Sequence, residues 1–373
     1  MNLRKLPTRE FDPLMLLTAL GLVAYGAALI YSGSLANYGS PSQALSHPVS
    51  RQIAFGAVGV LAMVVASRFD YRVLAPLSLS MYVVSLAMLI YVLVAGESEY
   101  GSSRWITIAG TQIQPAEIAK VTTVILLAKF LADNEDNIKS LRVFATSMAI
   151  AAVPAALVLV EPDLGSSLVF AVLWFAIVVI AGARPLHIGV VLVAAATLAP
   201  LAIWQLAHGY QLERFKVWID PESDPTGAGF NIIQAETSIG SGGFWGKGFT
   251  HGTQTQLDYL RTQTTDYVFS VGAEELGFAG AMLLFALFII LLFRCVRVAG
   301  RADDAFGRLI AVGVAAFIVF QVFVNIGVNI RLMPVTGVPL PLVSQGGSSL
   351  ITILAALGIL QSILGHRRRR GRA

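Results

Sequence analysis

The chain has 373 residues, of which 56% are hydrophobic and only 13% are charged. A soluble domain carries about 25% charged residues, so this apolar excess is too large for one soluble core. The composition excludes an ordinary soluble protein and favours one that crosses a membrane many times. Cys295 is the single cysteine, so no intrachain disulfide can form.

Ten stretches of the sequence are candidates for membrane-spanning helices, which need roughly 20 mostly apolar residues. The fourth stretch is the least apolar, because it contains Glu117, Lys120 and Lys129. We therefore expect an all-α integral membrane protein of ten transmembrane helices, with residues 1–373 forming a single polytopic domain. The ten stretches run approximately over Leu14–Tyr31, Gln52–Ser67, Val73–Ala95, Glu117–Ala132, Val143–Val160, Ser166–Ala181, Leu186–Ala207, Tyr267–Phe293, Leu309–Val328 and Ser348–Gly365.

The positive charges between these stretches predict their orientation. Of the 26 Lys and Arg residues, eighteen fall in one alternating set of connections and seven in the other, while Lys120 lies inside a helix. Cytoplasmic connections carry the excess of positive charge. The richer set includes both ends of the chain, so both termini are expected in the cytoplasm, as an even helix count requires. The connection between helices seven and eight, about residues 208–266, then forms a large extracytoplasmic loop.

The basic run His366–Arg370 after the last helix has two explanations. It could bind nucleic acid, or it could fix the topology and contact anionic lipid headgroups. Because the run follows a membrane helix directly, the second explanation is preferred, and no nucleic-acid partner is expected.

The first of four unusual outside segments runs from Arg104 and Trp105 to Pro115, Glu117 and Lys120. Glu117 and Lys120 are three residues apart and share one helix face. Ionisable side chains at membrane depth usually face a cavity or a partner. The pair either neutralises itself and holds the helix in place, or it lines a cavity and positions a polar substrate.

The second and third segments are also polar. Asp163, in the sequence Glu161–Ser167, is expected to cap the helix that follows it. The long segment of about residues 208–266 is rich in glycine but is interleaved with aromatic residues, so disorder is not expected. Its glycines around Lys247 do not follow a strand and do not match a nucleotide-binding phosphate loop.

The long segment ends at Asp266, at the start of an apolar helix that also contains Glu274 and Glu275. Asp266 is either a plain helix cap, favoured there by the helix dipole, or a functional carboxylate at the edge of the membrane. In the fourth segment, Asn325–Ser349, glycines and prolines are too frequent for a spanning helix. Non-helical backbone near a membrane must be buried in protein or line a wet cavity.

Taken together and in order, these motifs resemble the SEDS family of bacterial membrane proteins, and its elongation branch more than its division branch. The motifs that carry the resemblance are Arg104-Trp105 with Gln114-Pro115-Ala116-Glu117, Pro162-Asp163-Leu164-Gly165, Gly246-Lys247-Gly248 with Gln254, Thr265-Asp266 with Glu274-Glu275, and Gly337 through Ser344. The sequence departs from the family pattern in places: Ala116 replaces a serine, and Gln345 replaces a tyrosine.

The resemblance implies a peptidoglycan glycosyltransferase of the bacterial cytoplasmic (inner) membrane, with its active site on the extracytoplasmic face. Its substrate would be lipid II, the undecaprenyl-pyrophosphate disaccharide-pentapeptide. Its partner would be a class B penicillin-binding protein, the transpeptidase of the elongation complex. Two rival functions remain open: a lipid II flippase, and a non-catalytic scaffold of the elongation machinery.

The linkage chemistry implied by this substrate requires one inversion at the anomeric carbon. Asp266, at the family's catalytic position, is the expected general base for the acceptor hydroxyl. Positive charge is needed at the leaving pyrophosphate, and Arg104 and Arg214 are preferred for it. A divalent cation could share that task, but no metal-ligand cluster of known spacing is present, so no metal site or other cofactor is assigned. The other residues expected to contact substrate are Glu117, Lys120, Lys247, Gln254 and Ser344.

Overall fold

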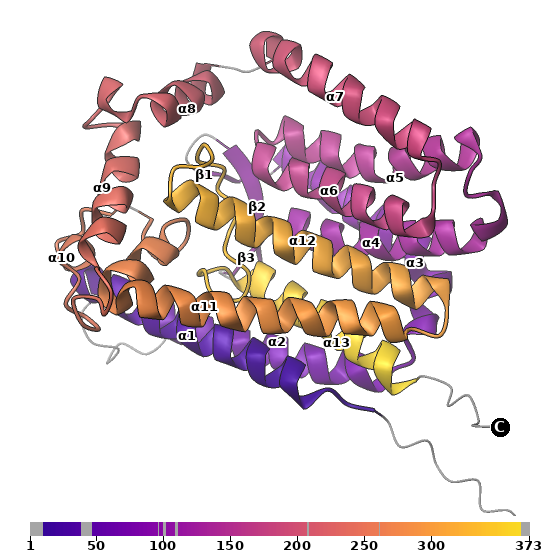
Figure 1. The fold of residues 1–373 in the computed structure, drawn as a ribbon, viewed down its shortest axis with the longest axis horizontal. Helices are drawn as coiled ribbons and strands as arrows, with labels where there is room; N and C mark the ends of the chain where they lie inside the picture. Colours follow the sequence, from indigo (N-terminus) through magenta and orange to yellow (C-terminus); the bar gives the residue numbers. More distant parts are fainter. Residues whose placement is uncertain are drawn as a thin grey trace, which may run out of the picture.

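The computed structural model describes residues 10–38, 47–95, 97–99, 102–108, 111–206, 209–260 and 262–366. Arg261, the basic N-terminal residues and the arginines of the C-terminal tail lie outside these ranges. The described chain is a bundle of roughly parallel and antiparallel helices (Figure 1). The long helices are α1 (Pro13–Tyr38), α2 (Pro48–Arg68), α3 (Leu74–Ala95), α4 (Pro115–Asp133), α5 (Leu141–Val160), α6 (Leu164–Ala181), α7 (Pro185–Leu206), α11 (Val268–Arg301), α12 (Ala305–Asn329) and α13 (Gly347–Gly365).

Eight of these helices are long and apolar enough to cross a membrane: α1, α2, α3 with the short turn before it, α5, α6, α11, α12 and α13. All ten expected stretches fall mainly on helices. However, α4 carries four charged residues. The apolar stretch of α7 among the described residues, Pro185–Thr197, is shorter than the eight candidate spans. The molecule is therefore a mostly helical, multi-pass membrane protein, as expected.

Helix α4 lies inside the bundle, where α3, α5, α6 and α12 pack against it (Figure 1). Most of its residues are buried, including Glu117 and Lys120, which are each 1% exposed. This position explains why α4 tolerates charges that a lipid-facing helix could not, since its charged groups meet protein partners instead of acyl chains.

Two features that were not expected from the sequence lie at one end of the bundle: a small sheet, and helices within the long loop. A small antiparallel sheet, in the order β1-β2-β3, is formed by Glu97–Glu99, Ser102–Ile108 and Thr111–Ile113. The segment expected as a long loop contains α8 (Gly209–Ile219), a 3-10 turn at Pro221–Ser223, α9 (Ala228–Ser241) and α10 (Thr253–Gln256). In Figure 1, α8 to α10 form an arch beside the ends of α1 and α11.

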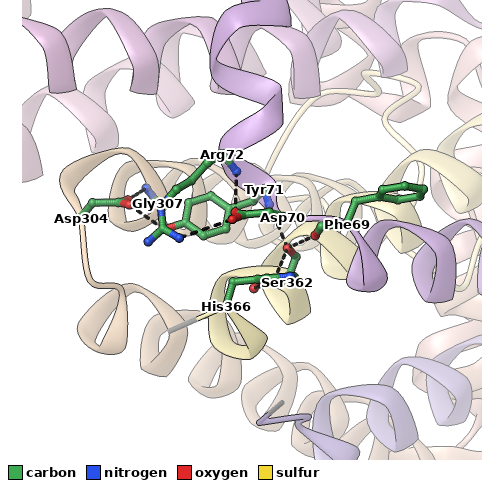
Figure 2. A network of polar contacts seen from close by, with 8 residues as sticks. All are labelled: Phe69, Asp70, Tyr71, Arg72, Asp304, Gly307, Ser362 and His366. Carbon is green, nitrogen blue, oxygen red and sulfur yellow. Dashed lines mark hydrogen bonds and ion pairs between the residues drawn. The ribbon is translucent and has the colours of Figure 1, made fainter. Parts of the chain in front are cut away.

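Polar contacts at the opposite end of the bundle bring both ends of the described chain together. The Asp12 N–H donates to Gln361 Oε1 at 2.9 Å, and Gln361 Nε2 donates to the Asp12 carbonyl at 2.7 Å. Figure 2 shows a second network there, in which Tyr71 Oη and Arg72 Nε donate to Asp304 at 2.7 and 3.0 Å. These contacts join the start of α1 to the end of α13, and the start of α3 to the start of α12.

Helix α11 is broken at Gly277, whose φ of 65° and ψ of −162° are not helical. Four backbone hydrogen bonds from the loop Gly242–Gly248 fill the break. The N–H groups of Lys247 and Gly248 donate to the carbonyls of Glu274 and Glu275, each at 3.0 Å, and the carbonyls of Gly243 and Phe244 accept from Phe278 and Ala279 at 2.9 and 3.0 Å. The segment Val268–Leu276, called the half-helix below, is therefore held by the loop as a separate piece.

Gly277→Ala should prevent this arrangement. The backbone conformation alone costs of order 1–3 kcal/mol for a residue with a side chain. In addition, a Cβ at Gly277 would lie 2.2 Å from Gly246 N, a backbone atom that cannot move aside. We expect a large loss of monodisperse protein and of thermal stability, measured by fluorescence-detected size exclusion after heating.

Gly300→Ala is the matched control, because Gly300 lies in the same helix and a Cβ there meets nothing within 4 Å. That variant should be at least as stable as the parent, since alanine favours a helix over glycine. Equal stability of the two variants would contradict the described break.

Candidate active site

Asp266 lies in a tight turn that leads into the half-helix. Its N–H donates to the Thr262 carbonyl at 3.1 Å. Its own carbonyl accepts from two side-chain amides of α12, Asn325 Nδ2 at 3.2 Å and Asn329 Nδ2 at 2.9 Å. These contacts fix the backbone N–H and carbonyl of Asp266 and do not involve its carboxylate.

The structure does not show Asp266 as the N-cap residue of α11. The N-cap position of α11 is Tyr267, and no side chain caps the helix there. Asp266 is partly exposed in the turn before this helix.

The loop between α12 and α13 also forms hydrogen bonds with the turn that contains Asp266. Ser344 Oγ donates to the Thr265 carbonyl at 2.6 Å and accepts from the Leu340 N–H at 2.9 Å. The Gln345 N–H donates to the Thr264 carbonyl at 2.9 Å. Ser344, predicted from sequence to contact substrate, therefore uses its hydroxyl to hold the backbone next to Asp266.

Burial and the charges around Asp266 together determine the pKa of its carboxyl. Burial raises the pKa of the Asp266 carboxyl to about 6, although the positive charges of Arg214 and Arg104 pull it down; Asp163 adds to the rise. Asp266, Arg104 and Arg214 were predicted from the sequence as site residues, and the structure brings them into one electrostatic cluster. A carboxyl with a pKa near 6 is ionised at neutral pH yet basic enough to accept a proton.

Arg104 reaches the cluster from β2 and is held tightly. Its Nη2 donates to the Pro162 carbonyl at 2.7 Å, and its Nη1 lies 3.6 Å from Asp163 Oδ2. Asp163 also caps α6 as expected, accepting from the Ser166 N–H at 2.9 Å. Burial, with Asp163 nearby, raises the pKa of Glu161 to about 8 despite Arg104.

Arg214 comes from α8 and is partly buried. Its Nη1 donates to the Val335 carbonyl at 3.0 Å, which fixes the α8 arch to the loop between α12 and α13. The cluster around Asp266 is therefore assembled from four distant parts of the chain: β2, the α5–α6 turn, α8 and the turn before α11.

Lys247 and Gln254 lie elsewhere, around Glu274 of the half-helix. Lys247 Nζ donates to Glu274 Oε1 at 2.8 Å, and the Gln254 N–H donates to the same oxygen at 2.9 Å. Thr255 donates to the other carboxylate oxygen through its N–H and its hydroxyl, at 3.2 and 2.9 Å. Lys247 and Gln254 were predicted to contact substrate. In the structure they contact Glu274 and stabilise the loop that fills the break in α11.

Glu117 and Lys120 form a pair of their own in α4, with Nζ to Oε1 at 2.6 Å. This geometry matches the first of the two explanations left open by the sequence, a pair that neutralises itself.

Sequence reasoning assigned no role to Asn325 and Asn329, although they are four residues apart and share one face of an apolar helix. Asn329 Oδ1 also accepts from the Ser270 hydroxyl at 2.6 Å, so α12 holds both the turn and the half-helix. Two amides on one face of a membrane helix were the signal that could have found them. Within the described ranges, no three His, Cys, Asp or Glu residues are grouped so as to hold a metal ion.

Fold and site together define a multi-pass membrane protein with a carboxylate and two arginines beside a broken helix. The chain belongs to the SEDS family: the FtsW/RodA/SpoVE family model, described as "Cell cycle protein", matches residues 12–369. Peptidoglycan glycosyltransferase MrdB of Escherichia coli K12 is 39% identical over 360 residues, which cover 96% of this chain and 95% of MrdB.

Two solved structures share the fold. One, from work on how a peptidoglycan synthase complex coordinates polymerization and crosslinking, has a TM-score of 0.80 and 32% identity, covering 96% of this chain and 99% of that chain. The rod shape determining protein RodA of Thermus thermophilus has a TM-score of 0.70 and 30% identity, covering 96% and 98%. The expected resemblance to the elongation branch is confirmed.

A double-mutant cycle on Glu117 and Lys120 separates their two explanations. Removing one partner of a buried pair costs roughly 3–5 kcal/mol, whereas replacing both can be near neutral. We therefore expect Glu117→Gln and Lys120→Met each to lower thermal stability in detergent, and the double variant to recover most of it. If every variant folds like the parent and the double variant has lost activity, the pair contacts substrate instead.

Proposed function

We infer that this chain is a peptidoglycan glycosyltransferase that polymerises lipid II into glycan strands for cell elongation. Its relatives carry that enzyme name, and the observation that supports the chemistry is the partly exposed Asp266 with a pKa of about 6 beside two arginines. The site residues named below are part of this proposal.

Asp266 is proposed as the general base. The donor sugar is linked α to its pyrophosphate and the product linkage is β, so one direct displacement inverts the anomeric carbon. Asp266 takes the proton from the acceptor 4-hydroxyl as the new bond to that carbon forms. The pyrophosphate departs with the bonding electron pair, and general-base assistance of this kind contributes typically 10²–10⁴-fold.

Arg104 and Arg214 are proposed to stabilise the charge that develops on the leaving pyrophosphate. Fixed cations at that position cost no reorganisation during the reaction. The contacts of both arginines with backbone carbonyls keep their charges in place before substrate arrives. Glu117, Lys120, Lys247, Gln254 and Ser344 support the site indirectly, through the helices and the turn that they hold.

For topology, we propose ten transmembrane helices, including α4 and α7, in one domain over residues 1–373. The contact between Asp12 and Gln361 supports placing both termini on one side. The eighteen-to-seven charge bias assigns that side to the cytoplasm. Asp266 and the α8–α10 arch then face the extracytoplasmic side, where a lipid-linked precursor is polymerised.

The proposed partner is a class B penicillin-binding protein that crosslinks the new strands. The similarity to a chain studied within a peptidoglycan synthase complex supports this pairing. A flippase, or a scaffold without activity, would have no need of a base at Asp266, so the experiment on Asp266 also separates these functions.

Asp266→Asn should abolish polymerisation while leaving the fold intact. The amide is nearly the same size as the carboxylate but cannot accept the proton, so the rate should fall on the order of 10² or more. The measurement is glycan polymer formed from lipid II by the purified protein, with and without its partner. Asp220→Asn, at an exposed aspartate of the α8–α10 arch, is the control and should keep the parental rate.

The pH profile gives a second readout of the same assignment. Because the base must be deprotonated, kcat/KM of the parent should rise with pH through about 6 and level off above it. Polymerisation by the Asp266→Asn protein at near-parental rate would reject Asp266 as the base.

Thiol labelling tests the proposed orientation. Ser223 is exposed in the turn between α8 and α9, and Cys295 is buried. With Cys295 replaced, a cysteine at Ser223 should react with a membrane-impermeant thiol reagent in intact spheroplasts. Labelling only after lysis would reverse the orientation.

A further inference from the structure

The loop that fills the break in α11 carries two strongly exposed aromatic side chains. Phe244 is 58% exposed and Trp245 is 78% exposed, and their rings meet edge to face with centroids 4.9 Å apart. Large apolar side chains exposed side by side mark an interaction surface more often than scattered ones do. These two residues are called the aromatic tip below.

The aromatic tip continues a surface that faces lipid. The Phe244 ring lies 5.7 Å from the ring of Phe278, which is 52% exposed on the membrane-spanning helix α11. One turn further, Met282 and Leu283 are exposed on the same helix. Since an exposed apolar side chain on a spanning helix contacts acyl chains, the tip adjoins the lipid-facing surface of α11.

The position of Phe278 along α11 gives the depth of the tip. Arg294, paired with Asp12 at 2.5 Å, marks the opposite edge of the apolar part of this helix. At 1.5 Å per residue, Phe278 lies about 24 Å from Arg294 along the axis. The hydrocarbon core is about 30 Å thick, so Phe278 and the tip lie near its far edge.

We propose that Phe244 and Trp245 insert into the bilayer and bind the boundary between headgroups and acyl chains, in the outer leaflet under the orientation proposed above. Tryptophan and other amphipathic rings are enriched at that boundary. The loop can enter it more easily because four of its backbone groups are paired with those of α11. Its cation, Lys247, is paired with Glu274 and is not presented to the acyl chains.

The insertion has a consequence for the site if the proposed function is correct. The same loop holds the half-helix, and Asp266 precedes that half-helix. Contact of the tip with the leaflet therefore sets the height of Asp266 above the membrane in which the lipid-linked substrate lies.

Site-directed spin labelling measures the insertion without using activity. In a chain with Cys295 replaced, Trp245→Cys is labelled in nanodiscs of phosphatidylglycerol and phosphatidylethanolamine. Collision with oxygen, which concentrates in the bilayer, is compared with collision with a water-soluble nickel chelate. Leu283→Cys is the lipid-facing control, and Ser223→Cys is the control outside the membrane; both residues are exposed.

The label at position 245 should show more oxygen collision and less nickel collision than the label at 223. Because the boundary is shallower than the bilayer centre, it should also show less oxygen collision and more nickel collision than the label at 283. Nickel collision as high as at 223 would overturn the proposal, because the tip would then be in water. Low collision with both reagents would also overturn it, because protein, such as a second copy or another part of the chain, would then cover the tip.

Fluorescence quenching by brominated lipids tests the same proposal with a milder substitution. Trp245→Phe keeps an aromatic ring, so the loop should still fold. Bromines near the acyl carbonyl should quench the parent more than the variant, and bromines at the chain ends should give a smaller difference. Equal quenching of parent and variant at every bromine position would contradict insertion of Trp245.

Discussion

An interrupted helix in a membrane must have its freed backbone groups paired, because the hydrocarbon core offers no water to replace them. In this protein the loop Gly242–Gly248 supplies those partners at Gly277. The buried carboxylate of Glu274, paired with Lys247, then holds the loop in place. The rest of the site depends on this arrangement, because the loop bonds both the half-helix and the spanning part of α11 and so fixes one relative to the other.

The half-helix is oriented from its other end by contacts to the backbone, which spare the Asp266 carboxylate. Amides of α12 and the Ser344 hydroxyl hold the carbonyls of Asp266 and Thr265. Burial raises the pKa of the Asp266 carboxyl, and the positive charges of Arg214 and Arg104 lower it. These opposing effects, of which burial is the larger, give Asp266 a pKa of about 6.

Local patterns in the sequence predicted most of what is local in the structure. Runs of apolar residues located the helices, and Asp163 caps its helix as expected. The three-residue spacing of Glu117 and Lys120 offered their pairing as one of two explanations, and the structure shows that pair. The sequence did not predict contacts between distant positions: Lys247 pairs with Glu274, 27 positions away, and Ser344 reaches Thr265, 79 positions away. The short strands and the arch helices were also missed, since they lack the long hydrophobic pattern of a spanning helix.

The central claim, that Asp266 is the base for the acceptor hydroxyl, is tested most directly by a structure of the Asp266→Asn protein with lipid-linked acceptor and a non-hydrolysable donor analogue. The side chain at position 266 should lie at hydrogen-bond distance, about 2.6–3.2 Å, from the acceptor 4-hydroxyl. The donor pyrophosphate should lie on the side of Arg104 and Arg214. An acceptor hydroxyl that faces a different carboxylate, with position 266 turned away from both sugars, would contradict the account.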